Sequence, residues 1–217
     1  MTWCGPLQPV NASGGIVQGG VYADLRTESV AVISEIPFDG FAIGGLAVGE
    51  SKAQMYEIVE LVSTLLPADK PRYLMGVGSP EDLVESVARG VDMFDCVLPT
   101  RVARNGALFT KYGRVNIGNR RFSDQAGPLE DDCDCYACLN YSAAYLWHLF
   151  KAKEILGLRL ATVHNLRFLQ RLMTRMRISI EQNQFATFRD EFWAQYIPTD
   201  ETTRQAQRQK WLKARGD

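Results

Sequence analysis

The sequence predicts an α/β protein whose first part is the C-terminal half of a (β/α)8 barrel and whose second part is a cysteine-containing subdomain. Two observations predict this fold. Between residues 15 and 101, a short apolar run that ends in glycine or polar residues recurs four times, and each of the first three runs is followed by a pattern of helical period. After residue 101 this alternation stops, and three cysteines cluster between residues 133 and 138.

The first two units cover residues 15–66. Residues 15–20 form the first apolar run, and a helical pattern follows over residues 22–36; residues 40–49 form the second run, and its helix should stop at Pro67. Apolar residues at helical spacing predict the face that each helix buries. These residues are Leu25, Val32, Ile33 and Ile36 in the first helix, and Met55, Ile58, Val59, Val62 and Leu66 in the second.

The third unit begins with the apolar run at residues 72–78. Ser79 is a residue type that is favoured at a helix N-cap, and Pro80 is favoured at the first helical position. We therefore expect a helix over residues 81–89 that stops at Gly90.

The fourth run covers residues 91–97. Strands that are joined by helical crossovers run parallel, so the ends of all four runs should meet at one edge of a sheet. In a (β/α)-barrel this edge carries the active site. We therefore expect one pocket to be lined by Gln18, Gly45, Met75 and Asp95.

A doubly wound sheet is the alternative arrangement of such units. No G-x-G-x-x-G pattern opens the first helix, which makes dinucleotide binding unlikely for this chain. A closed barrel needs eight units, whereas this sequence has four. The expected fold is therefore half of a barrel.

Composition restricts the class of protein. The chain has 217 residues, 46% of them hydrophobic, and a formal net charge of −1, which argues against a uniformly basic nucleic-acid binder. No apolar stretch reaches the length of a membrane span, and the first residues do not resemble a signal peptide. The five cysteines show no disulfide-like spacing, so we expect reduced thiols and a cytoplasmic location.

The second part of the chain has a different pattern. It begins with six basic residues and no acidic one between residues 101 and 121. The expected elements are a hairpin over residues 107–112 and 114–117 around Gly113, a helix over 141–156 stopped by Gly157, a strand-like run at 160–163, and a helical region over 165–192 that breaks near 178–184. The expected divisions of the chain are 1–14, 15–101, 102–196 and a polar tail at 197–217.

Three cysteines and one histidine form a candidate metal site. Cys133, Cys135 and Cys138 supply three thiolates, and His164 supplies an imidazole from a point 26 residues further on. Four such ligands suit tetrahedral zinc in a structural role, so the second part is expected to be a zinc-binding subdomain. His148 is the alternative fourth ligand, but its spacing from Tyr141 and Tyr145 on a helix favours a packing or interface role.

Together these residues resemble the C-terminal part of a bacterial-type tRNA-guanine transglycosylase, also called queuine tRNA-ribosyltransferase. The resemblance extends from about Gly15 to Tyr196. The segments that carry it, besides the zinc ligands, are GIVQGG at 15–20, GGLAVGE at 44–50, YLMGVG at 73–78 and DCVLPTR at 95–101. The resemblance implies a TIM barrel with a zinc subdomain, which agrees with the pattern of units.

The resemblance also implies an activity. Family members are pentosyltransferases that exchange the wobble guanine of tRNAs with GUN anticodons for a 7-deazaguanine, in queuosine biosynthesis. Asp95 would be the nucleophile that attacks the anomeric carbon of the ribose, as the carboxylate does in retaining glycosidases.

The remaining roles are carried over by position. Gln18, Gly45, Leu46 and Met75 would form the base pocket, and Glu50 would support the backbone of the loop. Val48 stands where eukaryotic members usually have glycine, so the smaller bacterial substrate, 7-aminomethyl-7-deazaguanine, is expected. Arg101 and Arg104 would hold the tRNA anticodon loop, and Tyr141, Tyr145 and His148 would lie at a homodimer interface.

The N-terminal half of the family's barrel has no counterpart in this sequence. That half carries an aspartate proposed as the general acid or base, so we expect this chain to be a fragment with little or no turnover of its own. Residues 1–14 resemble nothing in the family. The alternatives are a non-catalytic, zinc-containing tRNA-binding or dimer-partner protein, and an archaeal-type relative that modifies a D-loop guanine.

Overall fold

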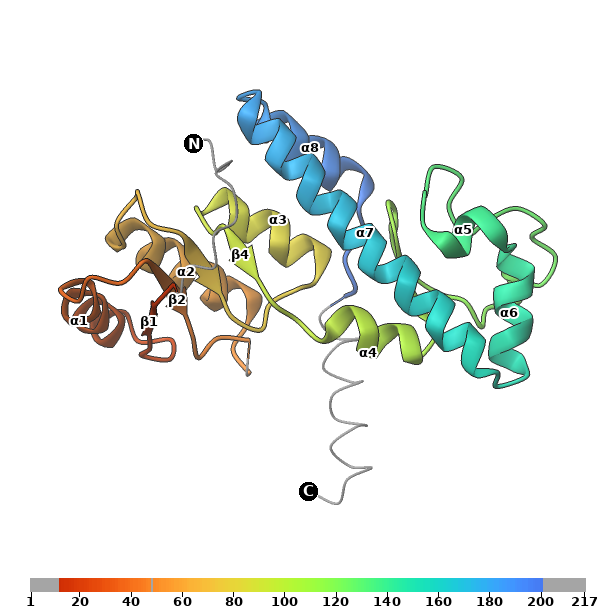
Figure 1. Ribbon diagram of the computed structural model, residues 1–217, viewed down its shortest axis with the longest axis horizontal. Helices are drawn as coiled ribbons and strands as arrows, with labels where there is room; N and C mark the ends of the chain where they lie inside the picture. The colour runs from red at the N-terminus through yellow and green to blue at the C-terminus, as the bar shows by residue number, and fades with distance from the viewer. Residues whose placement is uncertain (1–11, 48, 201–217) are drawn as a thin grey trace, which may run out of the picture. The chain divides into compact units, whose positions relative to one another are not determined.

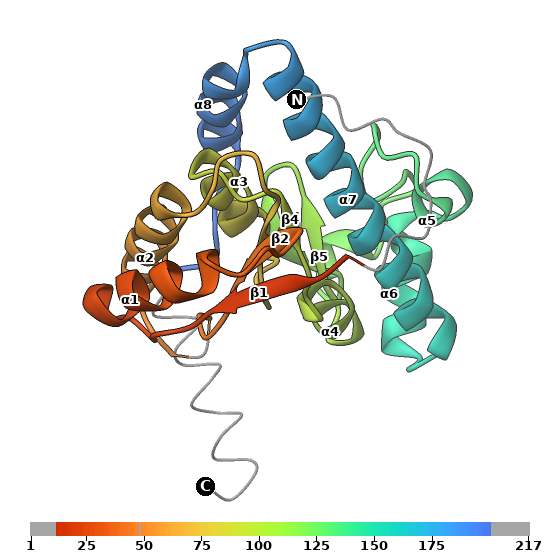
Figure 2. The ribbon, with the colours of Figure 1, turned by 60° about the vertical axis from the view of Figure 1, so that its left-hand side comes forward.

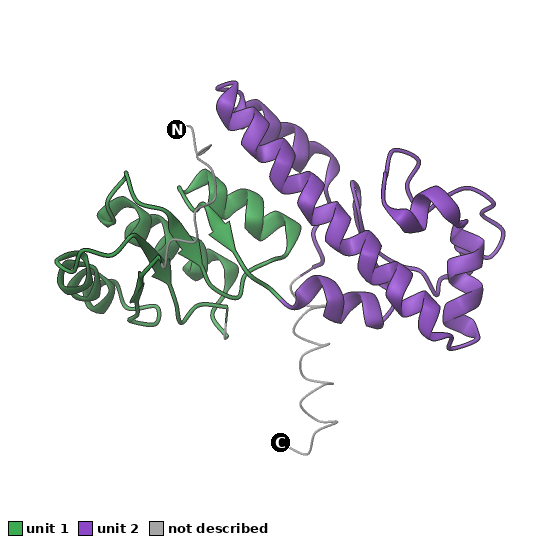
Figure 3. Ribbon diagram, viewed as in Figure 1, with its two compact units in different colours: residues 1–96 green, residues 97–217 purple. Residues whose placement is uncertain are grey.

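The structure is a computed structural model, and it describes residues 12–47 and 49–200. Val48, residues 1–11 of the expected N-terminal segment and residues 201–217 of the expected tail lie outside the described residues. The chain divides into two compact units, residues 1–96 and residues 97–217 (Figure 3). Each unit is described by itself.

The first unit is a parallel sheet with three helices. Its sheet has the strand order β1-β2-β3-β4, and every neighbouring pair is parallel, so the predicted four-stranded parallel sheet is confirmed (Figures 1 and 2). The order follows the sequence and does not reverse, as it would in a doubly wound sheet. The elements are β1 (Gly14–Val17), α1 (Ala23–Ser34), β2 (Gly40–Ile43), α2 (Lys52–Leu65), β3 (Arg72–Leu74), α3 (Pro80–Ala88) and β4 (Met93–Phe94).

The two faces of this sheet differ. Successive side chains of a strand point to opposite faces. One row of paired residues, Val17, Ile43, Leu74 and Phe94, packs into the hydrophobic core with residues of α1 and α2. The row on the other face consists of Ile16, Ala42, Tyr73 and Met93, and Ile16 and Met93 there are 45% and 48% exposed.

Helix α2 follows from its sequence in detail. Ser51 is its N-cap and forms a capping box with Gln54, which satisfies two backbone N–H groups at the start of the helix. The predicted stripe of five apolar residues, from Met55 to Leu66, is buried. Each such residue contributes about 1.5–3 kcal/mol of hydrophobic free energy when it is fully buried. The helix ends at Leu65, just before Pro67, as predicted.

Helix α1 forms where it was predicted, but of its predicted apolar face only Ile33 packs against the core. Leu25, Val32 and Ile36 are exposed, whereas Arg26 and Val30 are the buried residues of the helix. The prediction failed because it assigned the interior to apolar residues alone. Arg26 occupies the interior because its guanidinium binds backbone carbonyls at the end of the sheet.

The second unit is a hairpin surrounded by helices. The predicted hairpin is present as β5 (Ala107–Thr110) and β6 (Gly113–Asn116), which pair antiparallel. Helix α4 (Leu98–Arg104) was not predicted, because Pro99 suggested only the end of a strand. The other elements are the 3-10 helix η1 (Arg120–Phe122), α5 (Tyr136–Asn140), α6 (Ala143–Lys151), α7 (Ile155–Glu181) and α8 (Phe185–Gln195).

The strand-like run predicted at residues 160–163 is wrong. These residues lie inside α7, which also contains Gly157, the residue predicted to end the preceding helix. That helix instead ends at Lys151, before a turn in which Lys153 adopts φ 58°. Short apolar runs cannot be assigned to strand or helix by periodicity alone, and Leu160, Ala161 and His164 have the spacing of one buried helix face.

The break predicted in residues 178–184 is confirmed, because α7 ends at Glu181 and α8 begins at Phe185. Asn183 adopts the left-handed conformation in the connecting turn, with φ 57°. None of the described helices is both long enough and apolar enough to cross a membrane.

Candidate active site and metal centre

Gln18 and the glycine pair at residues 44–45 lie against each other at the ends of β1 and β2. A Cβ atom on Gly44 would lie 2.5 Å from Gln18 Nε2, and a Cβ atom on Gly45 would lie 2.5 Å from Gln18 Oε1. Gly45 also adopts φ 68°, a conformation that other residues rarely take. The two glycines therefore make the space in which the Gln18 carboxamide rests. Gln18 and Gly45 are both exposed at this end of the sheet.

The loop that follows is held by Glu50. Its carboxylate accepts hydrogen bonds from the backbone N–H groups of Ala47 and Gly49. Ala47 takes a positive φ of 63°, which a side chain normally disfavours. The Leu46 side chain is buried in the core, so its backbone is the part that can face a ligand. The position of Glu50 agrees with the expectation that it supports the loop backbone.

Asp95 lies just beyond β4 and is exposed, not turned into the apolar interior. Its Oδ1 atom accepts hydrogen bonds from the Tyr73 hydroxyl at 2.6 Å and from the Gly76 backbone N–H at 2.8 Å. These hydrogen bonds, that from Tyr73 first, lower the pKa of Asp95 below its ordinary value because they favour the charged form. Asp95 is therefore held as an oriented, ionised carboxylate at neutral pH.

The ends of the four strands lie along the same edge of the sheet, because all four strands are parallel. The Met75 backbone N–H donates to the Ile43 carbonyl at 3.2 Å, which joins the ends of β2 and β3. Met75 itself is half-buried. The hydrogen bond from Gly76 to Asp95 joins the ends of β3 and β4 in the same way. The structure thus places Gln18, Gly45, Met75 and Asp95 along one edge, in the order of their strands.

The two arginines predicted to bind tRNA lie on helix α4, in the second unit. Arg101 and Arg104 are both exposed and are three residues apart, so they lie on the same side of the helix. Sequence reasoning assigned no helix here, so this shared side is a feature that the structure adds.

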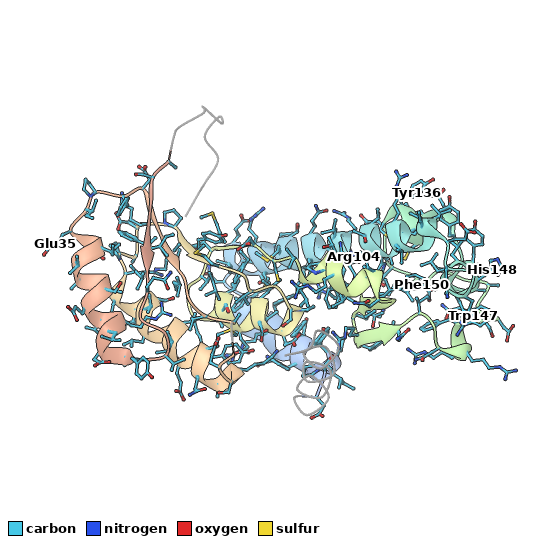
Figure 4. All side chains as sticks on the ribbon, turned by 90° about the horizontal axis from the view of Figure 1, so that it is seen from below. Glu35, Arg104, Tyr136, Trp147, His148 and Phe150 are labelled. Carbon is cyan, nitrogen blue, oxygen red and sulfur yellow. The ribbon has the colours of Figure 1, made fainter. Side chains whose placement is uncertain are left out.

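The aromatic residues expected at a dimer interface also belong to the second unit. The Tyr141 and Tyr145 rings are stacked with centroids 5.3 Å apart, and Tyr136 lies edge-on to Tyr141 at 5.9 Å. His148 follows Tyr145 by one helical turn on α6 and is exposed (Figure 4). His148 is therefore a surface residue, and it does not belong to the metal-ligand cluster.

Three cysteines and His164 form that cluster. The ligand atoms of Cys133, Cys135, Cys138 and His164 all lie within 4.8 Å of one another. His164 Nδ1 is 3.7, 3.6 and 3.4 Å from the sulfur atoms of Cys133, Cys135 and Cys138 in turn. Zinc bonds of about 2.3 Å to sulfur and about 2.0 Å to nitrogen at a tetrahedral angle would separate these atoms by about 3.5 Å. The donor set therefore fits a tetrahedral divalent metal with four protein ligands.

Two helices position these ligands. Cys135 is the N-cap of α5, and its sulfur accepts a hydrogen bond from the Cys138 backbone N–H at 3.3 Å. His164 is fully buried in α7, and its Nε2 atom is 2.7 Å from the Phe109 carbonyl oxygen. A carbonyl can only accept, so Nε2 carries the proton and Nδ1 is the atom that can bind a metal.

The electrostatics of the cluster favour a cation. The Cys133 and Cys138 side chains, in that order, lower the pKa of Cys135 to about 3, whereas the Cys133 and Cys135 side chains raise the pKa of Cys138. Three sulfur atoms this close do not all ionise by themselves, because like charges repel. A bound divalent cation removes this conflict.

Ion pairs hold the loop that carries the cysteines. Arg167 on α7 donates to both carboxylate oxygens of Asp134, between Cys133 and Cys135. Arg171 lies one turn further along, 4.0 Å from Asp132 and 3.9 Å from Asp134. These partly exposed pairs add little stability in water, but they fix the loop against the helix that carries His164.

Sequence reasoning missed several residues at the two sites. Tyr73 lies in a strand, and nothing in its own position signals that its hydroxyl reaches Asp95, 22 residues away. Arg26 was not noticed because a charged residue in an amphipathic helix is normally assigned to the surface. Phe109 takes part through its backbone carbonyl, which no sequence pattern reveals.

Comparisons with known proteins agree in pointing to one family. The sequence profile of the queuine tRNA-ribosyltransferase family (TGT) matches residues 8–198. The match includes residues 8–14, so the expectation that residues 1–14 resemble nothing in the family is wrong for that part. Among curated proteins, the queuine tRNA-ribosyltransferase of Dehalococcoides mccartyi is 54% identical over 200 residues, which are 92% of this chain and 51% of that protein. The protein of the same name from Shewanella halifaxensis is 59% identical over 187 residues, 86% of this chain and 50% of that protein. The chain spans about half the length of the curated relatives that it matches.

Proposed function

The chain belongs to the queuine tRNA-ribosyltransferase family, and on this premise we propose that it serves the exchange of the wobble guanine of GUN-anticodon tRNAs for 7-aminomethyl-7-deazaguanine. Asp95 is the proposed nucleophile. The observation that carries the proposal is the state of this residue. Asp95 is an exposed carboxylate with a lowered pKa, held by Tyr73 and Gly76 at the sheet edge that also presents Gln18 and Gly45.

The proposed reaction has two displacements. Asp95 attacks C1′ of the nucleotide while the bond from C1′ to the guanine nitrogen breaks, and guanine leaves with the electron pair of that bond. The ribose is then held to Asp95 by an ester-like bond. The ring nitrogen of the incoming base attacks C1′ from the face that guanine left, the ester-like bond breaks, and the carboxylate is restored. The incoming base loses the proton of that nitrogen and the departed guanine anion takes up a proton, so the exchange is balanced in protons and charge. Two inversions give net retention.

The hydrogen bonds of Asp95 suit this role. Tyr73 and Gly76 both donate to Oδ1, so we expect Oδ2 to make the bond to C1′. The carboxylate is ionised at neutral pH and needs no base to activate it. As the ribose develops oxocarbenium character, this negative charge stabilises it.

The base pocket has groups of the right chemistry. The Gln18 carboxamide offers both a donor and an acceptor to the polar edge of a purine, and the Met75 thioether suits a ring face. Glu50 binds the Ala47 N–H, so the Leu46 carbonyl in the same trans peptide points away from Glu50. A carbonyl in this orientation accepts a hydrogen bond from an aminomethyl group, which favours 7-aminomethyl-7-deazaguanine as the substrate.

The Cys133, Cys135, Cys138 and His164 cluster is the proposed zinc site. A metal held by four protein ligands has no open position for a substrate, so zinc would supply folding stability and take no part in the chemistry. Arg101 and Arg104 are proposed to hold phosphates of the tRNA anticodon loop, and the Tyr141, Tyr145 and His148 surface is proposed as a homodimer contact.

Trapping of the covalent intermediate tests the proposal. The purified chain is incubated with labelled cognate tRNA, denatured, and run on a denaturing gel, and the adduct is digested and mapped. We expect an adduct on Asp95 with the unchanged chain and none with Asp95→Asn. Asp92→Asn is the matched control, because Asp92 is an exposed carboxylate just before β4, whereas Asp95 lies just after it, and Asp92 accepts a hydrogen bond from the Arg72 N–H.

Two results would contradict the nucleophile assignment. An adduct that survives in Asp95→Asn, or one that maps to another residue, assigns the attack elsewhere. Binding of tRNA without any adduct supports the alternative, a non-catalytic tRNA-binding protein of the same family.

A further inference from the structure

Arg26 is a fully buried arginine behind the ends of β1 and β2. Its Nε atom donates to the Gly20 carbonyl at 2.9 Å, Nη1 donates to the Val17 carbonyl at 3.0 Å, and Nη2 donates to the Gly44 carbonyl at 2.8 Å. A fully buried arginine whose three hydrogen bonds go to backbone carbonyls is unusual, because burial of a charged group is unfavourable.

These hydrogen bonds fix the strand end from which Gln18 projects. The Val17 carbonyl accepts from Arg26 and also from the Gly44 N–H at 3.0 Å. The N–H of the same peptide, that of Gln18, donates to the Ser29 hydroxyl at 3.2 Å. Arg26 and Ser29 are three residues apart on α1, so one side of this helix holds the peptide from both ends.

The hydrogen bond to Gly44 sets the direction of the next peptide. The described chain contains no cis peptide bond, and in a trans peptide the C=O and the N–H point in opposite directions. Because the Gly44 carbonyl points inward to Arg26, the Gly45 N–H points outward. Gly44 is buried and Gly45 is exposed, which agrees with this orientation. The Gln18 carboxamide lies against the same two glycines.

We propose that Arg26 is the positioning residue of the purine pocket. Arg26 holds the Gly44–Gly45 peptide and the Gln18 backbone so that the Gly45 N–H and the Gln18 carboxamide face the polar edge of the bound base. This inference rests on the proposed function and extends it to a residue that does not touch the substrate. The base leaves with a pair of electrons, so its ring carbonyl gains negative charge in the transition state. A cation that binds the opposite end of the Gly44–Gly45 peptide strengthens the Gly45 N–H as a donor to that charge.

The environment of Arg26 is consistent with this role. Burial lowers the pKa of Arg26, and the charge of Glu50 acts in the opposite direction. An arginine nevertheless stays protonated in proteins, so the pocket keeps a positive charge behind it at every pH of interest. A lysine would keep the charge but could not reach three carbonyls with a fixed planar fork.

Arg72 provides a matched control on the same sheet. It also donates to backbone carbonyls, with Nη2 at 3.0 Å from Leu66 and Nη1 at 3.3 Å from Gly90. Arg72 lies at the start of β3. Because the strands are parallel, this is the end of the sheet opposite to the strand ends that carry Gln18 and Asp95. Arg72→Lys should therefore loosen the sheet without changing the pocket.

Amide hydrogen exchange on the full chain measures the positioning directly. In Arg26→Lys we expect exchange to rise about tenfold in the peptides that cover residues 17–20 and 44–47, with little change around residues 66 and 90. In Arg72→Lys we expect the reverse. Similar exchange at residues 17–20 and 44–47 in both variants would overturn the inference. Arg26→Gln serves as the second variant, because it removes the charge and keeps one donor.

Binding of guanine to the same proteins is the second measurement. We expect Arg26→Lys to weaken guanine binding about tenfold and to leave tRNA binding within about twofold, whereas Arg72→Lys changes neither. Unchanged guanine binding in an Arg26→Lys protein whose loops exchange faster would overturn the inference. Absence of guanine binding in the unsubstituted chain would instead contradict the proposed function, and it would leave the exchange result for Arg26 intact.

Discussion

The hydrogen bond from the Tyr73 hydroxyl to Asp95 Oδ1 sets both the direction and the charge of this carboxylate. It is the largest cause of the lowered pKa of Asp95, and it also raises the pKa of Tyr73 itself. Both effects have the same origin, since the bond favours the charged carboxylate and the protonated phenol. Both effects suit a nucleophile that works at neutral pH, because Asp95 stays ionised and Tyr73 stays protonated as its hydrogen-bond donor.

Tyr73→Phe removes this donor and keeps the ring. We expect the pKa of Asp95 to rise toward its ordinary value, so the acid limb of the pH–rate profile should move to higher pH. The sign follows because the reacting form is the carboxylate, which in the variant is protonated at a higher pH. We also expect the rate at neutral pH to fall about tenfold, since Asp95 loses one of its two orienting bonds. The measurement is the rate at which the covalent adduct with tRNA forms, as a function of pH, because this single step does not require turnover.

Tyr56→Phe is the control for Tyr73→Phe. Tyr56 also donates to a carboxylate, Asp82, at 2.6 Å, but between α2 and α3. An acid limb that stays in place in Tyr73→Phe, or that moves equally in both variants, would contradict the assigned role of Tyr73.

At the level of the elements, helix α7 organises the second unit by binding its other elements. It carries His164 and, one residue on, Asn165, whose fully buried side chain binds the Phe109 N–H and the carbonyls of Pro99 and Ala107, each at 3.0 Å. These bonds attach α7 to α4 and β5. The metal cluster depends on this arrangement, because His164 must meet three cysteines that lie 26 to 31 residues earlier.

We expect Cys138→Ser to lose the metal. A hydroxyl is a poor zinc ligand, and three remaining ligands bind far more weakly than four. Metal analysis of the purified full chain should show about one zinc per chain before the substitution and a small fraction after it. The midpoint of thermal unfolding should fall by on the order of 10 °C, because metal binding contributes directly to folding.

Cys96→Ser is the control for Cys138→Ser. Cys96 lies in the first unit, with its sulfur 3.5 Å from the Gly76 carbonyl, and it is outside the ligand cluster. Full zinc content in Cys138→Ser, or an equal loss in Cys96→Ser, would show that the metal is bound elsewhere or not at all.

The elements also show what the sequence could predict. Strand–helix alternation, the α2 stripe and the three-cysteine motif are local patterns, and each led to a correct prediction of the element or cluster. The sequence predicts a strand at residues 160–163 because an apolar run this short fits a strand as well as a helix. The structure places these residues in α7, and tertiary packing determines that outcome. The contacts of Tyr73 and Arg26 join distant parts of the chain, so no local pattern reveals them.

At the scale of the whole molecule, the sheet of the first unit has one face that no helix of that unit covers. Its paired row includes Ile16 and Met93, which are 45% and 48% exposed. In the described residues, β1 and β4 each pair with a single strand. In a (β/α)8 barrel this row would point into the packed interior, which four further strands would close. The half-barrel interpretation therefore predicts an exposed apolar face on the sheet and two edge strands, β1 and β4, with unpaired backbone groups.

We expect the isolated chain to self-associate through this face, because exposed apolar rows and unpaired edge strands promote association. The double substitution Ile16→Lys with Met93→Lys should reduce both the concentration-dependent association in analytical ultracentrifugation and the binding of a hydrophobic dye. The control is Leu25→Lys with Val32→Lys, which places the same charges on α1 residues that are 48% and 58% exposed. Equal effects of the two pairs would contradict the half-barrel interpretation, because substitution of any exposed apolar residue would then reduce self-association to the same extent. A selective effect of the sheet pair would support the half-barrel interpretation, in which this row faces the interior of a closed barrel.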